Sequence, residues 1–465
     1  MLKPRFRRAP PDAPLPVLCP LVEGAPRPDG FVASMGRVRD MAGEQRRILI
    51  GLGTPRCRLD WERAGATAAA QLPETSHCAV AAEGLAPAEA AAFAAGLALG
   101  AWRFTVHRSR AIKPALERAS FTVGDPAACR TAWEAASPAI RACLFARDLV
   151  AEPANHLTTR NFAKRLEGLA EFGIHVDVWG RKRLARAGFG ALLAVGGGSA
   201  SPPRLAILRW RGTLDAPPVA FVGKGLVFDT GGISIKPAKG METMRADMAG
   251  AADCAGAILA LALRHSPAPA VAVLAIAENA TGAESYRPGD VLRTASGRTV
   301  EVVDTDAEGR LVLADALHHA VTAFRPRAVI DAATLTGAIV TALGHHRAGL
   351  FGTDAALLAA LAAAGEQTGE HLWPMPIGTR HREDLRSDIA DIRQCMPAGS
   401  RRQPDASHAA AFLRDFVGEA TPWAHLDIAG VDTQDKPHAL GPAGPTGFGV
   451  RLLDRLVASH YEEEA

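Results

Sequence analysis

Short apolar runs alternate with longer Ala- and Leu-rich segments after about residue 150. Five runs are apolar enough to be buried strands, and they cover 204–210, 219–228, 270–277, 300–303 and 328–332. Helices are predicted between several of them, at 243–263 and 311–324. This alternation is typical of an α/β domain with a largely parallel central sheet flanked by helices. Ligands of such sheets bind where strands end, so we expect the chemistry there.

The length of the chain favours two domains, because 465 residues exceed the size at which one hydrophobic core keeps growing. Residues 1–125 are rich in Ala and Pro, and short apolar runs such as 47–52 indicate a small N-terminal α/β domain. Apolar residues at spacings near three and four over 126–150 predict a linker helix. The larger domain would then be 151–465. The basic, Pro-rich stretch 1–20 lacks the apolar run of a signal peptide and predicts a disordered or irregular arm.

Charge and cysteine usage narrow the class of protein. The net charge of +3 gives no reason to expect nucleic acid or acidic substrates as the main partner. Seven scattered Cys residues without a CxxC pair favour a reduced, cytoplasmic setting. We find no segment that is apolar over roughly 18 to 20 residues without a charge or a Gly/Pro break, so no membrane span is expected. Familiar motifs such as HExxH, GxSxG and Walker A are missing from the sequence.

Charged residues interrupt the apolar run 219–236 where plain packing would not put them. Lys224 and Asp229 lie inside a strand-like stretch, and two Gly residues predict a tight turn before Lys236. Burying an unpaired charge is costly, so these side chains need compensating partners. A metal ion is one such partner.

A second charged segment, 302–311, runs from a short predicted strand into a predicted helix. Asp304, Asp306 and Glu308 alternate at a spacing of two, which in extended chain would direct all three carboxylates to one side. Asp247 lies near the start of the predicted helix 243–263, where a single acid is also a common first-turn residue. Each residue alone would suit a salt bridge or a cap. Together they predict a site for two hard divalent cations.

Six segments resemble the leucyl aminopeptidase family of cytosolic two-metal exopeptidases. They read VGKGLVFDTGGISIKP, MRADMAGAA, ENATGAESYRPGDV, DTDAEGRLVLADAL, DAATLTGA and WAHLDIAGV, and the resemblance covers 146–453. It implies that 151–465 is the catalytic metallopeptidase domain. It further implies hydrolysis of the N-terminal peptide bond of peptide substrates, with a preference for Leu-like or other apolar N-terminal residues.

The resemblance implies a ligand set for two divalent ions. Asp229 and Glu308 would bridge the metals, Lys224 and Asp247 would complete one site, and Asp306 would complete the other. Zn or Mn is the favoured metal, and Mg and Co stay open because such ligands suit several ions. A Lys nitrogen ligates only when neutral, so we expect the adjacent ion and burial to depress the pKa of Lys224.

The resemblance also implies the catalytic groups. Lys236 would stabilise the oxyanion formed when a metal-bridged hydroxide attacks the scissile carbonyl, and Arg310 would hold a bicarbonate ion as general base. Met244, Thr334 and Gly337 would line the pocket for the N-terminal side chain. A homohexamer is implied as well.

Two departures from the family pattern bear on these expectations. The family usually has Asn at the position of Asp304, which here adds a negative charge beside the site. Where a Gly-rich stretch ending in Thr is expected, 404–408 reads Pro-Asp-Ala-Ser-His, which puts the shape of the substrate cleft in question. The alternatives are an inactive scaffold on this fold and a DNA-binding architectural or regulatory protein. The basic N-terminus favours the DNA-binding alternative and the low net charge opposes it, so a gel shift at two salt concentrations would decide.

Overall fold

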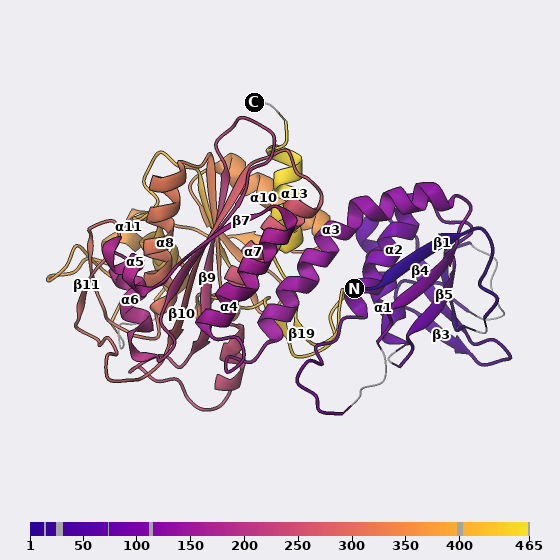
Figure 1. Cartoon of the computed structure of the whole chain (residues 1–465), viewed down its shortest axis with the longest axis horizontal. Helices are drawn as coiled ribbons and strands as arrows, with labels where there is room; N and C mark the ends of the chain where they lie inside the picture. Colours follow the sequence, from indigo (N-terminus) through magenta and orange to yellow (C-terminus); the bar gives the residue numbers. More distant parts are fainter. Residues whose placement is uncertain (14, 25–30, 73, 111–114, 398–402, 464–465) are drawn as a thin grey trace. The chain divides into compact units, whose positions relative to one another are not determined.

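The chain folds into two compact units, which the computed structural model in Figure 1 describes except for residues 14, 25–30, 73, 111–114, 398–402 and 464–465. The first unit comprises Met1–Leu144 and Gln434–Thr446, and the second comprises Phe145–Thr433 and Gly447–Ala465. Helix α3 (Pro126–Ala151) contains the boundary. The return of 434–446 to the first unit was not anticipated from the sequence.

The first unit is built on a six-stranded sheet that is parallel except at one edge. Its order is β1 (Lys3–Arg7), β6 (Arg118–Thr122), β5 (His77–Ala81), β2 (Val17–Val22), β4 (Arg47–Gly53) and the antiparallel β3 (Val38–Met41). Helices α1 (Arg58–Ala70) and α2 (Pro87–Gly100) pack against each other. Strand β4 confirms the predicted strand 47–52. The prediction of an irregular N-terminal arm was wrong, because Leu2, Phe6 and Leu18 are buried and their segments pair in the sheet.

The second unit contains the large sheet. Its order is β15 (Leu372–Pro374), β14 (Ala348–Gly352), β17 (Trp423–Asp427), β13 (Ala328–Ala333), β9 (Val219–Asp229), β10 (Ala270–Asn279), β8 (Arg204–Trp210) and β7 (His175–Trp179). The four central strands β17, β13, β9 and β10 run parallel, and antiparallel pairs occur at β14/β17, β10/β8 and β8/β7. The predicted α/β fold with a mostly parallel sheet flanked by helices is confirmed.

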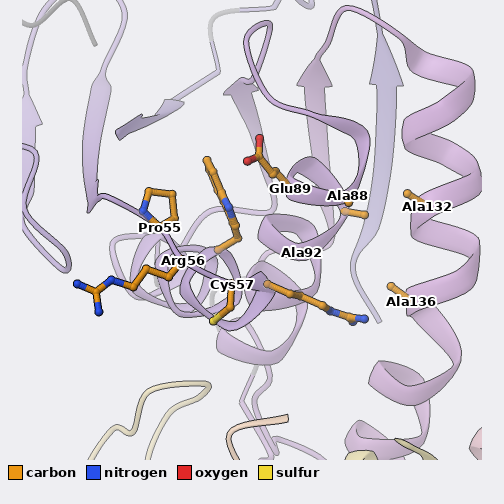
Figure 2. A pocket seen from close by; sticks show the side chains of 11 residues that line it. Pro55, Arg56, Cys57, Ala88, Glu89, Ala92, Ala132 and Ala136 are labelled. Atoms are coloured by element: carbon orange, nitrogen blue, oxygen red, sulfur yellow. The ribbon is translucent and has the colours of Figure 1, made fainter. Parts of the chain in front are cut away.

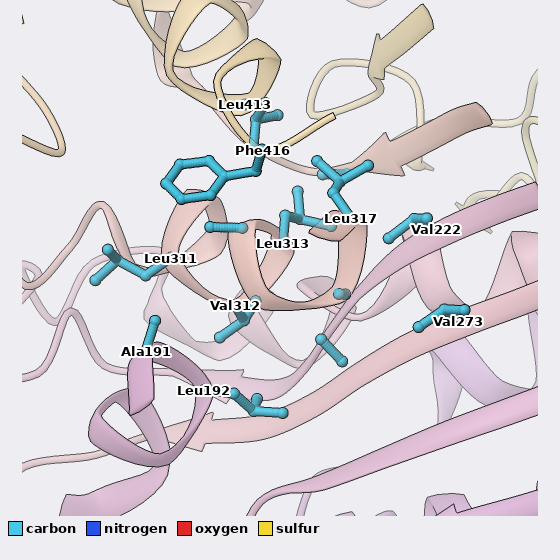
Figure 3. Packing of buried hydrophobic residues seen from close by; sticks show 14 of the residues in the cluster. Ala191, Leu192, Val222, Val273, Leu311, Val312, Leu313, Leu317, Leu413 and Phe416 are labelled. Carbon is cyan, nitrogen blue, oxygen red and sulfur yellow. The ribbon is translucent and has the colours of Figure 1, made fainter. Parts of the chain in front are cut away.

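Helices cover both faces of this sheet. The residues 222 and 223 of β9 point to opposite faces, as neighbours in a strand must. A Cβ at Gly223 would meet Ala251 of α7 (Ala249–Leu263), whereas Val222 belongs to the apolar cluster around α8 (Glu308–Phe324). Figure 3 shows residues of α8 packed against Val222 and Val273 of the sheet. Leu192, Leu413 and Phe416 belong to the same apolar cluster. This burial fixes the N-terminus of α8 at the carboxyl end of β9.

The remaining elements are short or peripheral. They are α4 (Thr159–Glu167), α5 (Arg181–Arg186), α6 (Gly190–Val195), α9 (Gly337–Leu343), α10 (Ala355–Thr368), α11 (Thr379–Glu383), α12 (Asp405–Arg414), α13 (Val450–His460), the 3-10 helices η1 (Gly168–Phe172), η2 (Gly196–Gly198) and η3 (Met241–Ala246), and the strands β11 (Val291–Arg293), β12 (Thr299–Glu301), β16 (Ile392–Arg393), β18 (Thr433–Gln434) and β19 (Gly444–Pro445).

Three sequence predictions needed correction in this unit. The run 300–303 is not a strand of the main sheet, because β12 pairs with β11 and β16 in a separate small sheet. The predicted helix 243–263 is split into η3 and α7, and the predicted helix 311–324 begins earlier, at Glu308. The segment Met241–Leu263 is long and apolar enough to cross a membrane by composition, but 94% of its apolar window is buried inside the protein. Its contacts with β9, β10 and α13 account for that composition.

Candidate metal centre

The predicted metal ligands converge at the carboxyl end of strand β9. Asp229 ends that strand, Asp306 lies in the turn before α8, and Glu308 is the first residue of α8. One carboxylate oxygen from each of these three residues lies within 4.8 Å of the others. Asp247 follows η3 and is also buried. The structure therefore brings together acids that are far apart in the sequence.

Lys224 ties the buried part of this cluster together. Its ammonium lies 2.8 Å from Asp247 Oδ1 and 2.8 Å from Glu308 Oε1, and it donates a hydrogen bond of 2.8 Å to the carbonyl of Thr334. The side chain is only 3% exposed. Gly309 makes room for it, since a Cβ there would lie 2.8 Å from the last three atoms of Lys224. The Lys224 ammonium therefore joins three segments of the fold, which carry Asp247, Glu308 and Thr334.

Lys236 closes the more open side of the cluster. Its ammonium lies 2.8 Å from Asp229 Oδ2 and also pairs with Asp306 Oδ1. The loop that carries it turns through Gly231, whose φ of 85° favours glycine, and closes with a bond from the Lys236 N–H to the Thr230 carbonyl. Lys236 is 21% exposed, so solvent reaches the centre from this side.

Negative charge is in excess at the centre. Four carboxylates stand against the two ammonium groups of Lys224 and Lys236. Burial and neighbouring carboxylates raise the pKa values of Asp247 and Glu308, and they raise that of Asp306 to about 7. Divalent cations would relieve this repulsion without the need for protons.

The expected depression of the Lys224 pKa is not seen in the chain by itself. Burial alone lowers this pKa, but the carboxylates of Asp247, Glu308 and Asp229 outweigh burial and raise it above its usual value. The neutral amine therefore requires a bound cation that displaces the proton.

The residues present fit a pair of divalent cations. Asp247 Oδ2 and Glu308 Oε2 are buried and have no hydrogen-bond partner among the described residues, although a buried carboxylate oxygen normally has one. Glu308 is itself one of the three convergent carboxylates, and Lys224 joins it to Asp247. Hard oxygen ligands of this kind suit Mn, Mg, Zn or Co. In the metal-free chain the ammonium groups of Lys224 and Lys236 pair with the same carboxylates that would bind the cations.

The segment 304–308 converges differently from the prediction. It is not extended, because Asp304 Oδ1 accepts a 2.9 Å hydrogen bond from the N–H of Asp306, and α8 begins at Glu308. The turn brings Asp306 and Glu308 toward Asp229, whereas Asp304 is not part of the convergent group in the described chain. The spacing of two was therefore the wrong reason for placing Asp306 and Glu308 together.

Asn279 is a residue of the centre that sequence reasoning missed. It ends β10 opposite Asp229 of β9, and its Nδ2 donates to Asp229 Oδ1 at 2.7 Å and to the Thr305 carbonyl at 3.0 Å. The Tyr286 hydroxyl donates to the same carbonyl at 2.8 Å. A polar amide at the end of an apolar run was the available signal. Asn279 holds Asp229 and the turn before α8 in register.

The predicted pocket residues lie on segments around the centre. The Thr334 hydroxyl donates to Asp247 Oδ1 at 2.7 Å, and its carbonyl accepts from Lys224. Met244 is half-buried in η3, and its carbonyl accepts from the N–H of Asp247. Gly337 is exposed at the first position of α9. Thr334 is thus joined directly to the predicted ligands, and Met244 is joined through the backbone.

Arg310 does not fit the predicted bicarbonate ion. The guanidinium is buried, Nη1 donates to the Gln394 carbonyl at 3.0 Å, and Nη2 donates to Asp405 Oδ1 at 3.0 Å. An anion from solution would have to share this guanidinium with the Asp405 carboxylate, which already pairs with Nη2 and would repel a second negative charge. Burial lowers the pKa of Arg310, but Asp405 and other acidic neighbours raise it overall. We therefore route no catalytic step through bicarbonate.

The first unit has a cavity of its own, shown in Figure 2. Its volume is about 320 Å³, and the labelled side chains come from the segment just before α1, from α2 and from α3. Ala side chains form much of its wall, and Arg56, Cys57 and Glu89 also line it. None of the predicted site residues belongs to it.

Fold and site together define a class of protein, an α/β protein whose acid-and-lysine centre is fit to hold two divalent cations. Comparison with known proteins agrees: residues 144–454 match the model of the cytosol aminopeptidase family, catalytic domain. The chain belongs to this family, and it is accordingly a metal-dependent aminopeptidase, a peptide hydrolase with a dinuclear metal site.

Relatives cover most of the chain. It is 42% identical to a probable cytosol aminopeptidase of Brucella ovis, over 93% of this chain and 90% of that protein. It is 45% identical to a probable cytosol aminopeptidase of Gluconobacter oxydans, over 79% and 74%. Among solved structures, the bottromycin maturation enzyme BotP in complex with Mn is 36% identical, has a TM-score of 0.87, and covers 96% of this chain and 99% of that one.

Proposed function

We propose that this protein removes Leu-like or other apolar residues from the N-terminus of peptides, with Lys224, Asp229, Asp247, Asp306 and Glu308 holding two divalent cations. The convergence of these side chains at one sheet edge carries the proposal. Four acids next to ammonium groups, with two buried oxygens that have no partner in the described part of the chain, are a costly arrangement for packing alone.

The residues of the chain take distinct parts in this proposal. When bound, the cations supply Lewis acidity that activates water and polarises the scissile carbonyl. Lys236 donates to the oxyanion as charge develops there, since its ammonium is partly exposed at the open side of the centre. Asn279 and Gly231 hold Asp229 through 2.7 Å and 2.9 Å hydrogen bonds, so that the carboxylate is oriented in advance.

Substrate selection rests on the residues around the acid cluster. A free α-amine can ligate a cation, and this restricts cleavage to the first residue of a peptide. Met244, Thr334 and Gly337 would line the pocket for its side chain, and the flexible Met side chain suits unbranched and Leu-like groups.

The activity is tested with the purified protein and a chromogenic leucine amide in the presence of Mn or Zn. We expect release of the chromophore from the free amine and not from its N-acetylated form. Asp306→Ala should abolish release, and Glu284→Ala, which removes an exposed acid of the same unit, should not. Full turnover by the Asp306 variant would mean that the site has been misplaced.

Metal identity and stoichiometry are tested separately. We propose Mn or Zn at two ions per chain, to be measured by inductively coupled plasma mass spectrometry after dialysis. Asp229→Ala should lower the ratio of metal to protein, because Asp229 belongs to the convergent carboxylate group. An unchanged ratio in this variant would contradict the assignment.

A homohexamer in the cytoplasm is also proposed, on the family resemblance and the names of the relatives. Sedimentation velocity of the purified protein would give six chains per particle, and a monomer would contradict the proposal. The observation that favoured DNA binding has weakened, because the basic N-terminal residues Arg5 and Arg7 lie in strand β1 and not in a free arm.

A further inference from the structure

Arg310 has an ion-pair partner that is 95 residues away in the sequence. Asp405 is the first residue of α12, and its Oδ1 lies 3.0 Å from Arg310 Nη2. The two ends differ in exposure, since the Arg310 side chain is 3% exposed and that of Asp405 is 39% exposed. A buried guanidinium without an anion is strongly unfavourable, so this carboxylate stabilises the position of Arg310.

The other contacts of Arg310 leave it little freedom to turn away. Its Nη1 donates to the Gln394 carbonyl, and the Gln394 side chain in turn accepts from the N–H groups of Val303 and Asp304 and donates to the Ala307 carbonyl. Arg310 also lies in the first turn of α8, two residues after Glu308. The guanidinium is therefore held close in sequence and structure to the acid cluster, with one exposed carboxylate as its anion.

We propose that Asp405 is the built-in anion of Arg310 and that it closes this arginine to bicarbonate. This inference depends on the proposed function in one respect, because it concerns the same candidate metal centre. An anion from solution would have to displace a carboxylate that the chain keeps at high effective concentration. Asp405 acts as a positioning residue through Arg310, and the protein works without added bicarbonate. Removing its carboxylate opens the guanidinium to small planar anions.

The test compares wild type with Asp405→Ala in CO2-free buffer, with increasing bicarbonate against chloride at matched ionic strength. Asp415→Ala is the matched control, because Asp415 caps the other end of α12 and pairs with Arg298 and Arg382 instead. Thermal unfolding of the metal-free proteins is measured first, so that no metal carbonate can form. Hydrolysis of the leucine amide by the Mn-loaded proteins is measured second.

We expect bicarbonate to raise the Tm of Asp405→Ala by about 2 °C or more and to leave wild type and Asp415→Ala unchanged. Without bicarbonate the Asp405 variant should turn over more slowly than wild type, and bicarbonate should restore part of the rate. Equal responses of wild type and variant, or no response in either, would overturn the inference. Wild type without any hydrolytic activity would instead refute the proposed function, and the thermal measurement would still decide the role of Asp405.

Discussion

A methyl group added at Gly309 tests how tightly the centre is packed. Gly309 lies in the first turn of α8, next to Glu308, and an Ala Cβ there would lie 2.8 Å from Cδ, Cε and Nζ of Lys224. Optimal carbon contacts are about 3.5–4.0 Å, so the end of the lysine would have to move by about 0.7 Å or more. Its ammonium is fixed by Asp247, Glu308 and Thr334, so movement lengthens those contacts.

Two opposing effects set the size of the change in stability. Replacing Gly with Ala in a helix stabilises it by roughly 0.5–1 kcal/mol. Crowding a packed interior costs about 1–3 kcal/mol. We therefore expect Gly309→Ala to lower the free energy of unfolding by no more than about 2.5 kcal/mol. Catalysis should suffer more, because misplacing a group by about 1 Å can cost about 100-fold in rate.

The assay combines urea unfolding, metal content and kcat for the leucine amide. Gly168→Ala is the control, because a Cβ at Gly168 meets no atom within 4 Å and its φ of −60° suits Ala. That variant should match wild type in kcat and be unchanged or stabilised by about 0.4–1 kcal/mol. We expect kcat of Gly309→Ala to fall by about tenfold or more. If Gly309→Ala were stabilised like the control and kept full metal content and kcat, the tight packing around Lys224 would be refuted.

Three further variants probe the same unit. Asn279→Ala should reduce kcat and destabilise the fold by about 1–3 kcal/mol in urea unfolding, because it removes one of the two buried N–H donors to Asp229 and leaves only the Gly231 N–H. Lys236→Ala should lower kcat by about 100-fold yet tighten metal binding measured by calorimetry, since an ammonium leaves the carboxylates that it pairs with. Burial and the carboxylate of Glu370 raise the pKa of Asp253, so the native chain retains a proton that the unfolded chain has lost above its ordinary pKa of 3.8. Asp253→Asn should therefore be more stable than wild type by about 1 kcal/mol or more near pH 8, and urea unfolding should show the difference shrinking toward about pH 4.

Four strands of the large sheet were predictable because they are largely buried on both faces and read as continuous apolar runs. The runs 204–210, 219–228, 270–277 and 328–332 became β8, β9, β10 and β13 with small changes at their ends. The run 300–303 has the same composition, yet a run of this length does not say which sheet it joins. The proline-rich start was misjudged for a related reason, since its strands are stabilised by pairing with distant segments: β1 pairs with β6, and β2 pairs with β4 and β5.

The acids of the centre were visible because a charge inside an apolar run is costly and needs an explanation. Asn279 gave a weaker signal, because a neutral amide costs less to bury than a charge and its partner is 50 residues away. The same limit hid Asp405, whose meeting with Arg310 depends on how α12 packs beside α8. Local pattern and the family resemblance thus predicted the proposed ligands, while the residues that orient them followed from the tertiary structure.

The two lysines explain how a site for cations can form before cations bind. Without them, four carboxylates would meet in a buried space, and their repulsion would oppose docking of α8 on β9. Lys224 and Lys236 place positive charge between pairs of these acids, on segments that precede and follow the end of β9. The two ammonium groups do not neutralise all four carboxylates, and divalent ions would neutralise the remaining negative charge. The two lysines therefore help the metal-free chain to fold, in addition to their part in the chemistry. Substituting either lysine by Met should make folding depend more strongly on added metal.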